Sequence, residues 1–217
     1  MVRASEAAQR PVEHIDLLAV SKTRSADEVK ELALLGQKAF GENYLQEALE
    51  KIETLKPLHL EWHFIGPIQS NKTRPIAEHF SWVHSVDRLK IAQRLSDQRP
   101  KDAEPLNLCL QVNISREESK AGCLPEEAVS LALAISELPN IRLRGLMAIP
   151  EATDDPTLQR QRFSEVQALQ NTINAQGGTL DTLSMGMSGD IDAAIAKGAT
   201  IIRVGTALFG PRHYNKS

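Results

Sequence analysis

The chain has 217 residues, of which 41% are hydrophobic and 24% charged, the balance of an ordinary soluble domain. Its formal net charge is −3, which gives no basic field for holding nucleic acid and no polybasic patch for anionic lipid. The longest apolar runs have the length of strands, so we expect neither nucleic-acid binding nor a membrane span.

The amino terminus and the cysteines indicate where the protein works. Residues 1–14 carry several charged side chains but no apolar segment, so we expect no secretory signal. Cys109 and Cys123 have neither metal-binding nor redox spacing, and Cys109 lies in a strand-like run where packing is expected. Unpaired cysteines without a signal indicate a reducing, cytoplasmic location.

Apolar runs of strand length alternate with helical patterns along the whole chain. The first run, 15–22, ends on Lys22, and a helical pattern over 26–35 follows it, with Gly36 as a stop. The other predicted strands are 38–44, 60–67, 82–86, 106–114, 141–149, 179–187 and 200–209. The other predicted helices are 45–55, 71–79, 88–95, 125–138, 157–176 and 191–197.

This alternation predicts an α/β fold with a parallel sheet. Eight strand–helix units favour a compact (β/α)₈ TIM barrel, which normally needs about 250 residues and can be as small as ~200. The competing fold is a doubly wound open sheet, which usually has fewer strands. The chain shows no linker, low-complexity stretch or charge run, so we expect a single domain over 1–217.

Lys22 stands at the carboxyl end of the first predicted strand, where α/β folds keep their chemistry. Desolvation there favours the neutral amine, which can attack a carbonyl to form a Schiff base. The alternative is a solvated lysine at a strand end, because lysines are mostly exposed.

Two other strand ends are suited to an anion. Ser188, Gly189 and Asp190 lead into the predicted helix 191–197, with Asp190 as the expected N-cap, and Gly205 and Thr206 follow the last strand motif. Barrels commonly bind phosphate between the loops after strands seven and eight. The alternative for the first segment is a tight turn with a cap. It lacks the second glycine of a hydrolase nucleophile elbow, which argues against serine chemistry.

Arg203 is expected to face the lumen. Period-two alternation places Ile201, Arg203 and Gly205 on one face of the last strand, and a buried guanidinium needs a partner. That partner is either a lumen carboxylate such as Asp16 or a ligand heteroatom that cannot share its proton. A reactive lysine, a phosphate cup and an arginine between them outline a site for pyridoxal 5′-phosphate (PLP).

Three histidines and one further lysine have weaker signals. His59 and His63, with Glu61 between them, share one strand face, but no third ligand is spaced to complete a metal site, so structural roles are expected. The same holds for His84. Lys120 could reach toward the cofactor mouth, although a solvated side chain is the simpler interpretation.

At this point the chain resembles a known family. Several segments are similar, in order, to the YggS/PROSC family of pyridoxal-phosphate-binding proteins, and they extend from about residue 17 to 210. The segments are LLAVSKTR, FGENYLQEALEK, WHFIGPIQSNK, VNISREESKAG, LRGLMAIP, LSMGMSGD and IRVGTALFG. The family usually has a full helix before its first strand, whereas only about ten residues are available here.

The resemblance implies a fold-type III barrel related to the amino-terminal domain of alanine racemase. It implies that Lys22 carries the cofactor as a Schiff base, that Asn43 and Ile65 flank its ring, and that Arg203 faces its pyridine nitrogen. It also implies that the phosphate side is held by Met187, Ser188, Gly205 and Thr206.

The same residues predict binding without turnover. A permanently charged arginine disfavours a protonated pyridine nitrogen, which weakens the electron sink. The family's racemase relatives use a second domain with a tyrosine base, whereas neither Tyr44 nor Tyr214 is placed for that role, and the chain ends soon after its last strand motif. We therefore expect a monomeric PLP carrier in vitamin B6 and amino-acid homeostasis, with PLP-dependent apoenzymes as candidate partners. The alternatives are a small amino-acid racemase and a PLP-sensing regulator with a protein partner.

Overall fold

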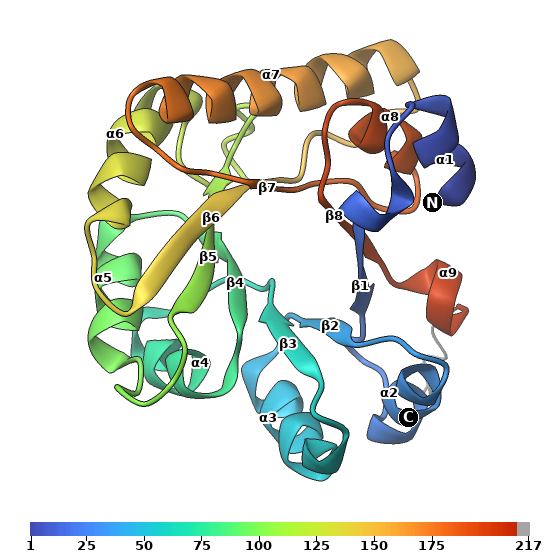
Figure 1. Ribbon diagram of the computed structural model, residues 1–217, viewed down its shortest axis with the longest axis vertical. Helices are drawn as coiled ribbons and strands as arrows, with labels where there is room; N and C mark the ends of the chain where they lie inside the picture. The colour runs from blue at the N-terminus through green and yellow to red at the C-terminus, as the bar shows by residue number, and fades with distance from the viewer. Residues whose placement is uncertain (212–217) are drawn as a thin grey trace.

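Eight parallel strands close into a barrel in chain order, β1 to β8, in the computed structural model, which describes residues 1–211 (Figure 1). Strand β8 pairs with β1 and completes the closure. The strands are β1 Asp16–Val20, β2 Ala39–Glu42, β3 Glu61–Phe64, β4 Trp82–Val86, β5 Leu106–Val112, β6 Ile141–Ala148, β7 Thr182–Ser184 and β8 Ile201–Val204. The predicted (β/α)₈ fold is therefore confirmed.

Helices surround the barrel and connect successive strands (Figure 1). They are α1 Val2–Ala7, α2 Ala26–Leu34, α3 Leu45–Thr54, α4 Thr73–His79, α5 Leu89–Gln98, α6 Pro125–Ser136, α7 Pro156–Ala175, α8 Ile191–Ala196 and α9 Thr206–Phe209. Short 3₁₀ turns cover Val12–His14, Lys56–Leu58 and Ser70–Lys72. Helix α1 is short, as expected, and lies beside α8, where Arg10 donates to the carbonyls of Ile195 and Ala199.

The end of the chain differs from the prediction. A strand was expected over 200–209, but β8 ends at Val204, and Gly205 is the N-cap of the four-residue helix α9. The apolar residues of that helix, including the half-buried Leu208 and Phe209, pack against the main core. A short apolar run is compatible with a buried strand and with a buried helix, so its periodicity alone does not distinguish the two.

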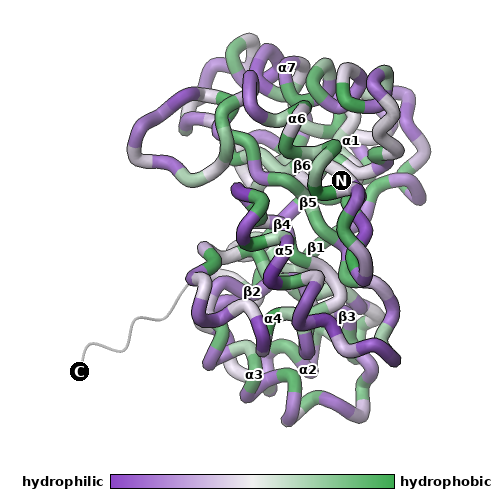
Figure 2. Tube along the Cα trace, turned by 90° about the vertical axis from the view of Figure 1, so that its left-hand side faces the viewer, coloured by the Kyte–Doolittle hydropathy of each residue, from purple (hydrophilic) through white to green (hydrophobic). Residues whose placement is uncertain are grey.

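The core has two parts, which follow from the alternation of side chains along each strand. Residues such as Phe40, Val83 and Ile202 join the large cluster between strands and helices. A smaller cluster contains Leu18, Trp82, Cys109, Met147 and Ile201 from different strands of the closed barrel, and so fills its lumen. Figure 2 shows the matching pattern in the outer ring, where hydrophobic and hydrophilic residues alternate along α7.

The turn between β1 and α2 is well defined by local hydrogen bonds. Ser25 is the N-cap of α2: its hydroxyl accepts from the Glu28 amide, and the Glu28 carboxylate accepts from the Ser25 amide. Such a capping box stabilises a helix start by about 1 kcal/mol. It fixes the point at which the chain leaves the turn that carries Lys22.

Candidate functional site

A cavity of about 330 Å³ opens at the carboxyl ends of the strands, the face on which TIM barrels hold their sites. All eight residues expected to hold the cofactor line it. These residues are Lys22, Asn43, Ile65, Met187, Ser188, Arg203, Gly205 and Thr206. They come from five different strand ends, so the barrel brings together residues that are as far as 184 positions apart in the chain. Their contact with a cofactor stays a prediction.

Four further residues line the same cavity and were not among those expected. They are Val20, Met147, Ile149 and Gly189. Alternation could have found the first three, because Val20 lies two residues before Lys22 and Met147 lies two before Ile149. Together with Ile65 they give the cavity an apolar wall, which is typical of small-molecule sites.

Lys22 is half-buried in the turn after β1, and its two neighbours are held by one ionic cluster. On one side, the Ser21 carbonyl accepts from Nζ of Lys51 at 2.7 Å, and the Ser21 hydroxyl donates to Glu42 at 2.6 Å. On the other side, the Thr23 amide donates to Glu47 at 2.7 Å. Lys51 pairs with both carboxylates, so the cluster grips the backbone before and after Lys22.

The backbone conformation of Thr23 indicates that these hydrogen bonds constrain the turn. Its φ is +63°, in the left-handed region that β-branched residues rarely adopt. Such strain persists only where the surroundings over-determine it, and it concentrates at functional sites. The turn of Lys22 is therefore held in place by its neighbours and not by its own backbone preference.

Sequence reasoning missed Glu42 and Lys51, although Lys51 had a signal. Lys51 lies on the apolar stripe of α3, three residues after Ala48 and four before Leu55, where a solvated lysine is out of place. Both side chains are buried. Burial raises the pKa of the Glu42 carboxyl, even though the Lys51 ammonium acts to lower it.

Asn43 and Gly66 form the next part of the wall. Oδ1 of Asn43 is buried and has no hydrogen-bond partner within residues 1–211. Gly66 packs so tightly on the Asn43 backbone that an added Cβ would lie 2.1 Å from its carbonyl oxygen. A buried acceptor without a partner is rare in folded proteins, and a ligand donor is one group that would satisfy it.

Arg203 lies on the lumen side of β8, as alternation predicted, but Asp16 is not its partner. The guanidinium donates to the carbonyl and hydroxyl of Ser184 at 2.6 and 2.7 Å, and to the carbonyl of Ala148 at 3.0 Å. Within residues 1–211 no carboxylate lies within ion-pair distance of it. Burial lowers the Arg203 pKa to about 10, which still leaves it charged at neutral pH.

In the loop after β7, Asp190 is at the expected N-cap position, but its side chain does not make the expected capping hydrogen bond. Asp190 is the N-cap residue of α8, but its carboxylate accepts from the Met187 amide at 2.6 Å instead of from the helix. Burial raises the pKa of Asp190. Because α8 has only six residues, we attribute anion binding here to local amides and hydroxyls, not to a helix dipole.

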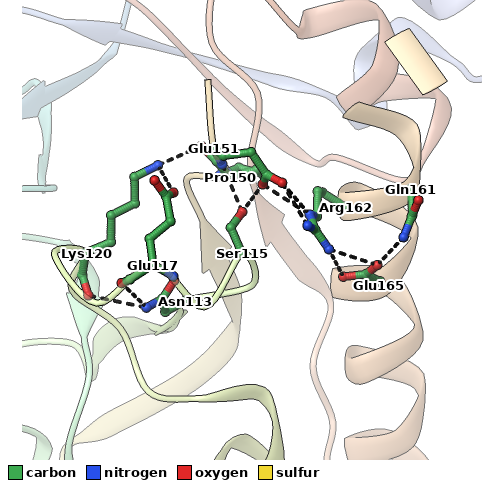
Figure 3. A network of polar contacts seen from close by, with 9 residues as sticks. All are labelled: Asn113, Ser115, Glu117, Lys120, Pro150, Glu151, Gln161, Arg162 and Glu165. Atoms are coloured by element: carbon green, nitrogen blue, oxygen red, sulfur yellow. Dashed lines mark hydrogen bonds and ion pairs between the residues drawn. The ribbon is translucent and has the colours of Figure 1, made fainter. Parts of the chain in front are cut away.

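Lys120 lies beside the cavity, at the edge of a neighbouring hollow that shares Ile149, Met187 and Gly189 with it. Figure 3 shows its ammonium donating to the Pro150 carbonyl at 3.0 Å and pairing with Glu117 at 2.6 Å. Its side chain is partly exposed and lines the neighbouring hollow, not the cavity that contains Lys22.

The same loop is tied to α7 by a second pair. In Figure 3, Glu151 binds both the Ser115 hydroxyl and the Arg162 guanidinium. The hydrogen bond from Arg162 lowers the Glu151 pKa to about 2.

The remaining candidates are placed as follows. His63 hydrogen-bonds to Glu61 and His84, not to His59. Within residues 1–211 no group of three or more His, Cys, Asp or Glu side chains is arranged to hold a metal ion. Tyr44 is largely exposed beside the site at the N-cap of α3, and Tyr214 lies outside the described residues. In the described part of the chain, no helix is both long and apolar enough to cross a membrane.

Comparison with known proteins agrees with this geometry. Residues 4–213 match the family model described as alanine racemase, N-terminal domain. The chain is 61% identical to the pyridoxal phosphate homeostasis protein of Pseudomonas aeruginosa, over 97% of this chain and 90% of that one. It is 50% identical to the Escherichia coli protein of the same name, over 95% and 90% of the two chains.

Solved structures give the same result. PipY of Synechococcus elongatus, solved with PLP bound, superposes with a TM-score of 0.85 at 38% identity, over 96% of this chain and 98% of PipY. Alanine racemase of Clostridium difficile shares the fold at a TM-score of 0.77 and 15% identity, over 99% of this chain and 59% of the racemase. The chain therefore belongs to the pyridoxal phosphate homeostasis protein family, whose barrel is that of the alanine racemase N-terminal domain.

Proposed function

We propose that this protein binds PLP through a Schiff base on Lys22 and serves in intracellular PLP and amino-acid homeostasis without enzymatic turnover. The observation that carries the proposal is the single cavity in which Lys22, Arg203 and the Ser188 and Thr206 loops face a common space. The names of the relatives and the PLP bound to PipY support it.

The lining residues fit the chemical groups of PLP. The Lys22 amine suits the aldehyde, and the apolar wall of Ile65, Met147 and Ile149 suits the aromatic ring. Ser188 and Thr206 offer hydroxyl groups for phosphate oxygens, beside glycines that let the backbone approach closely. The unsatisfied Oδ1 of Asn43 would accept from a ligand hydroxyl.

Arg203 is one reason to expect little turnover. When bound, PLP supplies an aldehyde for amines and a ring that accepts electrons, best when its nitrogen is protonated. Arginine can only donate hydrogen bonds, and this guanidinium keeps its charge at neutral pH. Its three hydrogen bonds within residues 1–211 use three of its five N–H groups, which leaves donors for a ring nitrogen without a proton.

We further propose that residues 1–217 act as one PLP-binding domain and as a monomer in the cytoplasm. In this role the protein would exchange the bound aldehyde with free pools or with PLP-dependent apoenzymes.

Absorbance before and after borohydride tests the attachment. Wild-type protein incubated with PLP should gain a visible chromophore that borohydride converts to a permanently attached, reduced form, because reduction turns the imine into a stable amine. Lys22→Ala should gain none. Lys30→Ala, which removes an exposed lysine of α2, should behave as wild type. A wild-type protein without a reducible chromophore would refute the proposal.

The absence of turnover needs its own experiment. PLP-loaded protein is incubated in deuterated water with each L-amino acid, and deuterium at the α-carbon is measured by mass spectrometry. We expect no incorporation above that of Lys22→Ala. Sustained incorporation, or a steady loss of optical activity, would instead establish the racemase alternative.

A further inference from the structure

A chain of hydrogen bonds crosses the barrel lumen and ends on Arg203. It begins at Glu61 on β3, whose carboxylate lies 2.7 Å from Nε2 of His63. Nδ1 of His63 lies 2.9 Å from Nε2 of His84 on β4, and Nδ1 of His84 lies 2.7 Å from the Ser184 hydroxyl. Ser184 on β7 in turn accepts from Arg203 at 2.7 Å.

The chain connects the two ends of the barrel. Glu61 and His63 line a cavity of about 520 Å³, together with Asp16 at the amino end of β1 and Trp82 at the amino end of β4. Arg203 lines the cavity at the carboxyl ends. The polar groups between the two cavities are buried: His84 and Ser184 are 0% exposed, and His63 is 3% exposed.

The imidazole of His63 is held in one orientation by its neighbours. The Trp82 ring stacks on it, with centroids 5.4 Å apart and an interplanar angle of 9°. The Arg144 guanidinium in turn lies over the Trp82 ring, 5.0 Å from its centroid. Such stacking is worth about 0.5–1.5 kcal/mol beyond burial. It helps to hold the His63 imidazole in the orientation in which each ring nitrogen has a hydrogen-bond partner.

The direction of every hydrogen bond in the chain follows from the charge at its outer end. The hydrogen bond from His63 lowers the Glu61 pKa, and burial lowers the pKa of both histidines. An ionised carboxylate only accepts, so His63 donates from Nε2, and as a neutral ring it must accept at Nδ1. His84 then donates from Nε2 and accepts at Nδ1, which makes the Ser184 hydroxyl its donor.

This leaves Ser184 with its lone pairs free for Arg203. A hydroxyl that donates to a polarised chain becomes a stronger acceptor, an effect that low dielectric enhances. The carbonyls of Ser184 and Ala148 complete the set of acceptors around the guanidinium. The direction of the chain therefore favours a single arrangement of Arg203.

We propose that Glu61, His63, His84 and Ser184 are positioning residues that orient the Arg203 guanidinium toward the cofactor cavity. The part of this proposal that concerns the cofactor rests on the function proposed above. In this proposal the four residues do not contact the cofactor themselves. They act on PLP through Arg203, by holding its N–H groups where the ring nitrogen would accept from them.

The first test needs no cofactor. In ¹⁵N NMR spectra of the wild-type protein, both His63 and His84 should be the Nε2–H tautomer, and the Arg203 N–H groups should give separate, slowly exchanging signals. Glu61→Gln keeps the size of the side chain but can donate as well as accept, so both histidines should show mixed tautomers. In Ser184→Ala the Arg203 signals should exchange about tenfold faster, because a charged hydrogen bond is lost.

The second test uses the visible spectrum of the PLP-loaded protein. Ser184→Ala and His84→Phe should shift the absorbance maximum or its pH midpoint and weaken PLP binding about tenfold. Ser184→Thr, which keeps the hydroxyl, should restore both. The matched control is Cys109→Ala, which removes a wholly buried lumen side chain outside the chain of hydrogen bonds and should leave the spectrum unchanged.

The outcomes separate the two proposals. If the histidines are Nδ1–H tautomers, or if Ser184→Ala and Cys109→Ala affect Arg203 and the spectrum equally, the positioning proposal is wrong. If wild-type protein binds no PLP, the proposed function fails, and the tautomers and the Arg203 signals still decide for or against the orienting chain. Far-UV circular dichroism checks that each variant is folded, and rescue by Ser184→Thr separates orientation from a packing defect.

Discussion

Nζ of Lys51 lies 2.8 Å from Oε1 of Glu42, and both side chains are buried directly behind the turn that carries Lys22. Breaking a buried ion pair from one side leaves an uncompensated charge and typically costs 3–5 kcal/mol. Lys51→Met should therefore lower the free energy of unfolding by about 3 kcal/mol, the low end, because the raised pKa lets Glu42 take up a proton. Urea denaturation measures this loss.

The same variant should also loosen Lys22. The carbonyl of Ser21 loses its hydrogen bond from Lys51, and Glu47, which binds the Thr23 amide, loses the ammonium that holds it in place. Because both neighbours of Lys22 are less well held, bound PLP should dissociate faster. Glu42→Gln combined with Lys51→Met should recover part of the stability, since no charge is left buried. Arg74→Met is the control: it breaks an exposed pair 3.9 Å apart and should cost less than about 1 kcal/mol. Equal losses in both variants would contradict the argument.

Gly66→Ala tests the contact that shapes the wall beside Asn43. The new methyl would lie 2.1 Å from the Asn43 carbonyl, so backbone must shift and the free energy of unfolding should fall by about 1–3 kcal/mol. Asn43 would move with it, and PLP affinity should fall. Thermal unfolding and a PLP titration measure the two effects.

Gly189→Ala is the matched control for stability. Gly189 lines the same cavity, but an added Cβ would meet nothing within 4 Å. Its free energy of unfolding should stay within about 0.5 kcal/mol of wild type. If Gly66→Ala is equally harmless, the close approach to Asn43 does not constrain the loop.

The sequence predicted the barrel and its strand ends because both depend on local patterns. Period-two alternation puts Arg203 in the lumen, and the end of the first apolar run puts Lys22 at the cavity rim. The partner of Arg203 could not be predicted in the same way. Ser184 and His84 are 100 residues apart, and their contact depends on which strands face each other across the closed barrel.

The missed partners have one physical cause. A polar side chain on a buried face signals that it must be satisfied, but not by which residue. His63, His84 and Lys51 all carry that signal, and only the three-dimensional arrangement assigns Glu61, Ser184 and Glu42 to them.

The cysteines should be unreactive in the folded protein. Both are buried, and burial raises each thiol pKa to about 12, so at pH 8 only about one thiol in 10⁴ is the reactive thiolate. Native protein should react with a maleimide far more slowly than protein in urea. Mass spectrometry of partly labelled protein should find Cys123, at 6% exposure, labelled before Cys109, at 0%. Fast labelling of Cys109 in the native state would show that the lumen opens.

Stability should fall as the pH drops below the histidine range. Burial lowers the pKa of His63 and His84 in the folded protein, while the unfolded chain titrates near 6.5. Between the folded and unfolded pKa values the unfolded state binds more protons, so acid favours unfolding. Each histidine should cost up to about 1.4 kcal/mol per pH unit below pH 6.5.

The measurement is urea denaturation between pH 8 and pH 5.5, with His84→Phe as the comparison. His84→Phe removes one of the two buried histidines whose pKa burial lowers, and so removes its share of the proton uptake on unfolding. The variant should therefore show a shallower fall in unfolding free energy with acid than wild type, whatever its absolute stability. His14→Phe, which replaces an exposed histidine of the first 3₁₀ turn, should leave the slope unchanged. A wild-type stability that is flat from pH 8 to pH 5.5 would mean that folding does not lower the pKa of the two buried histidines.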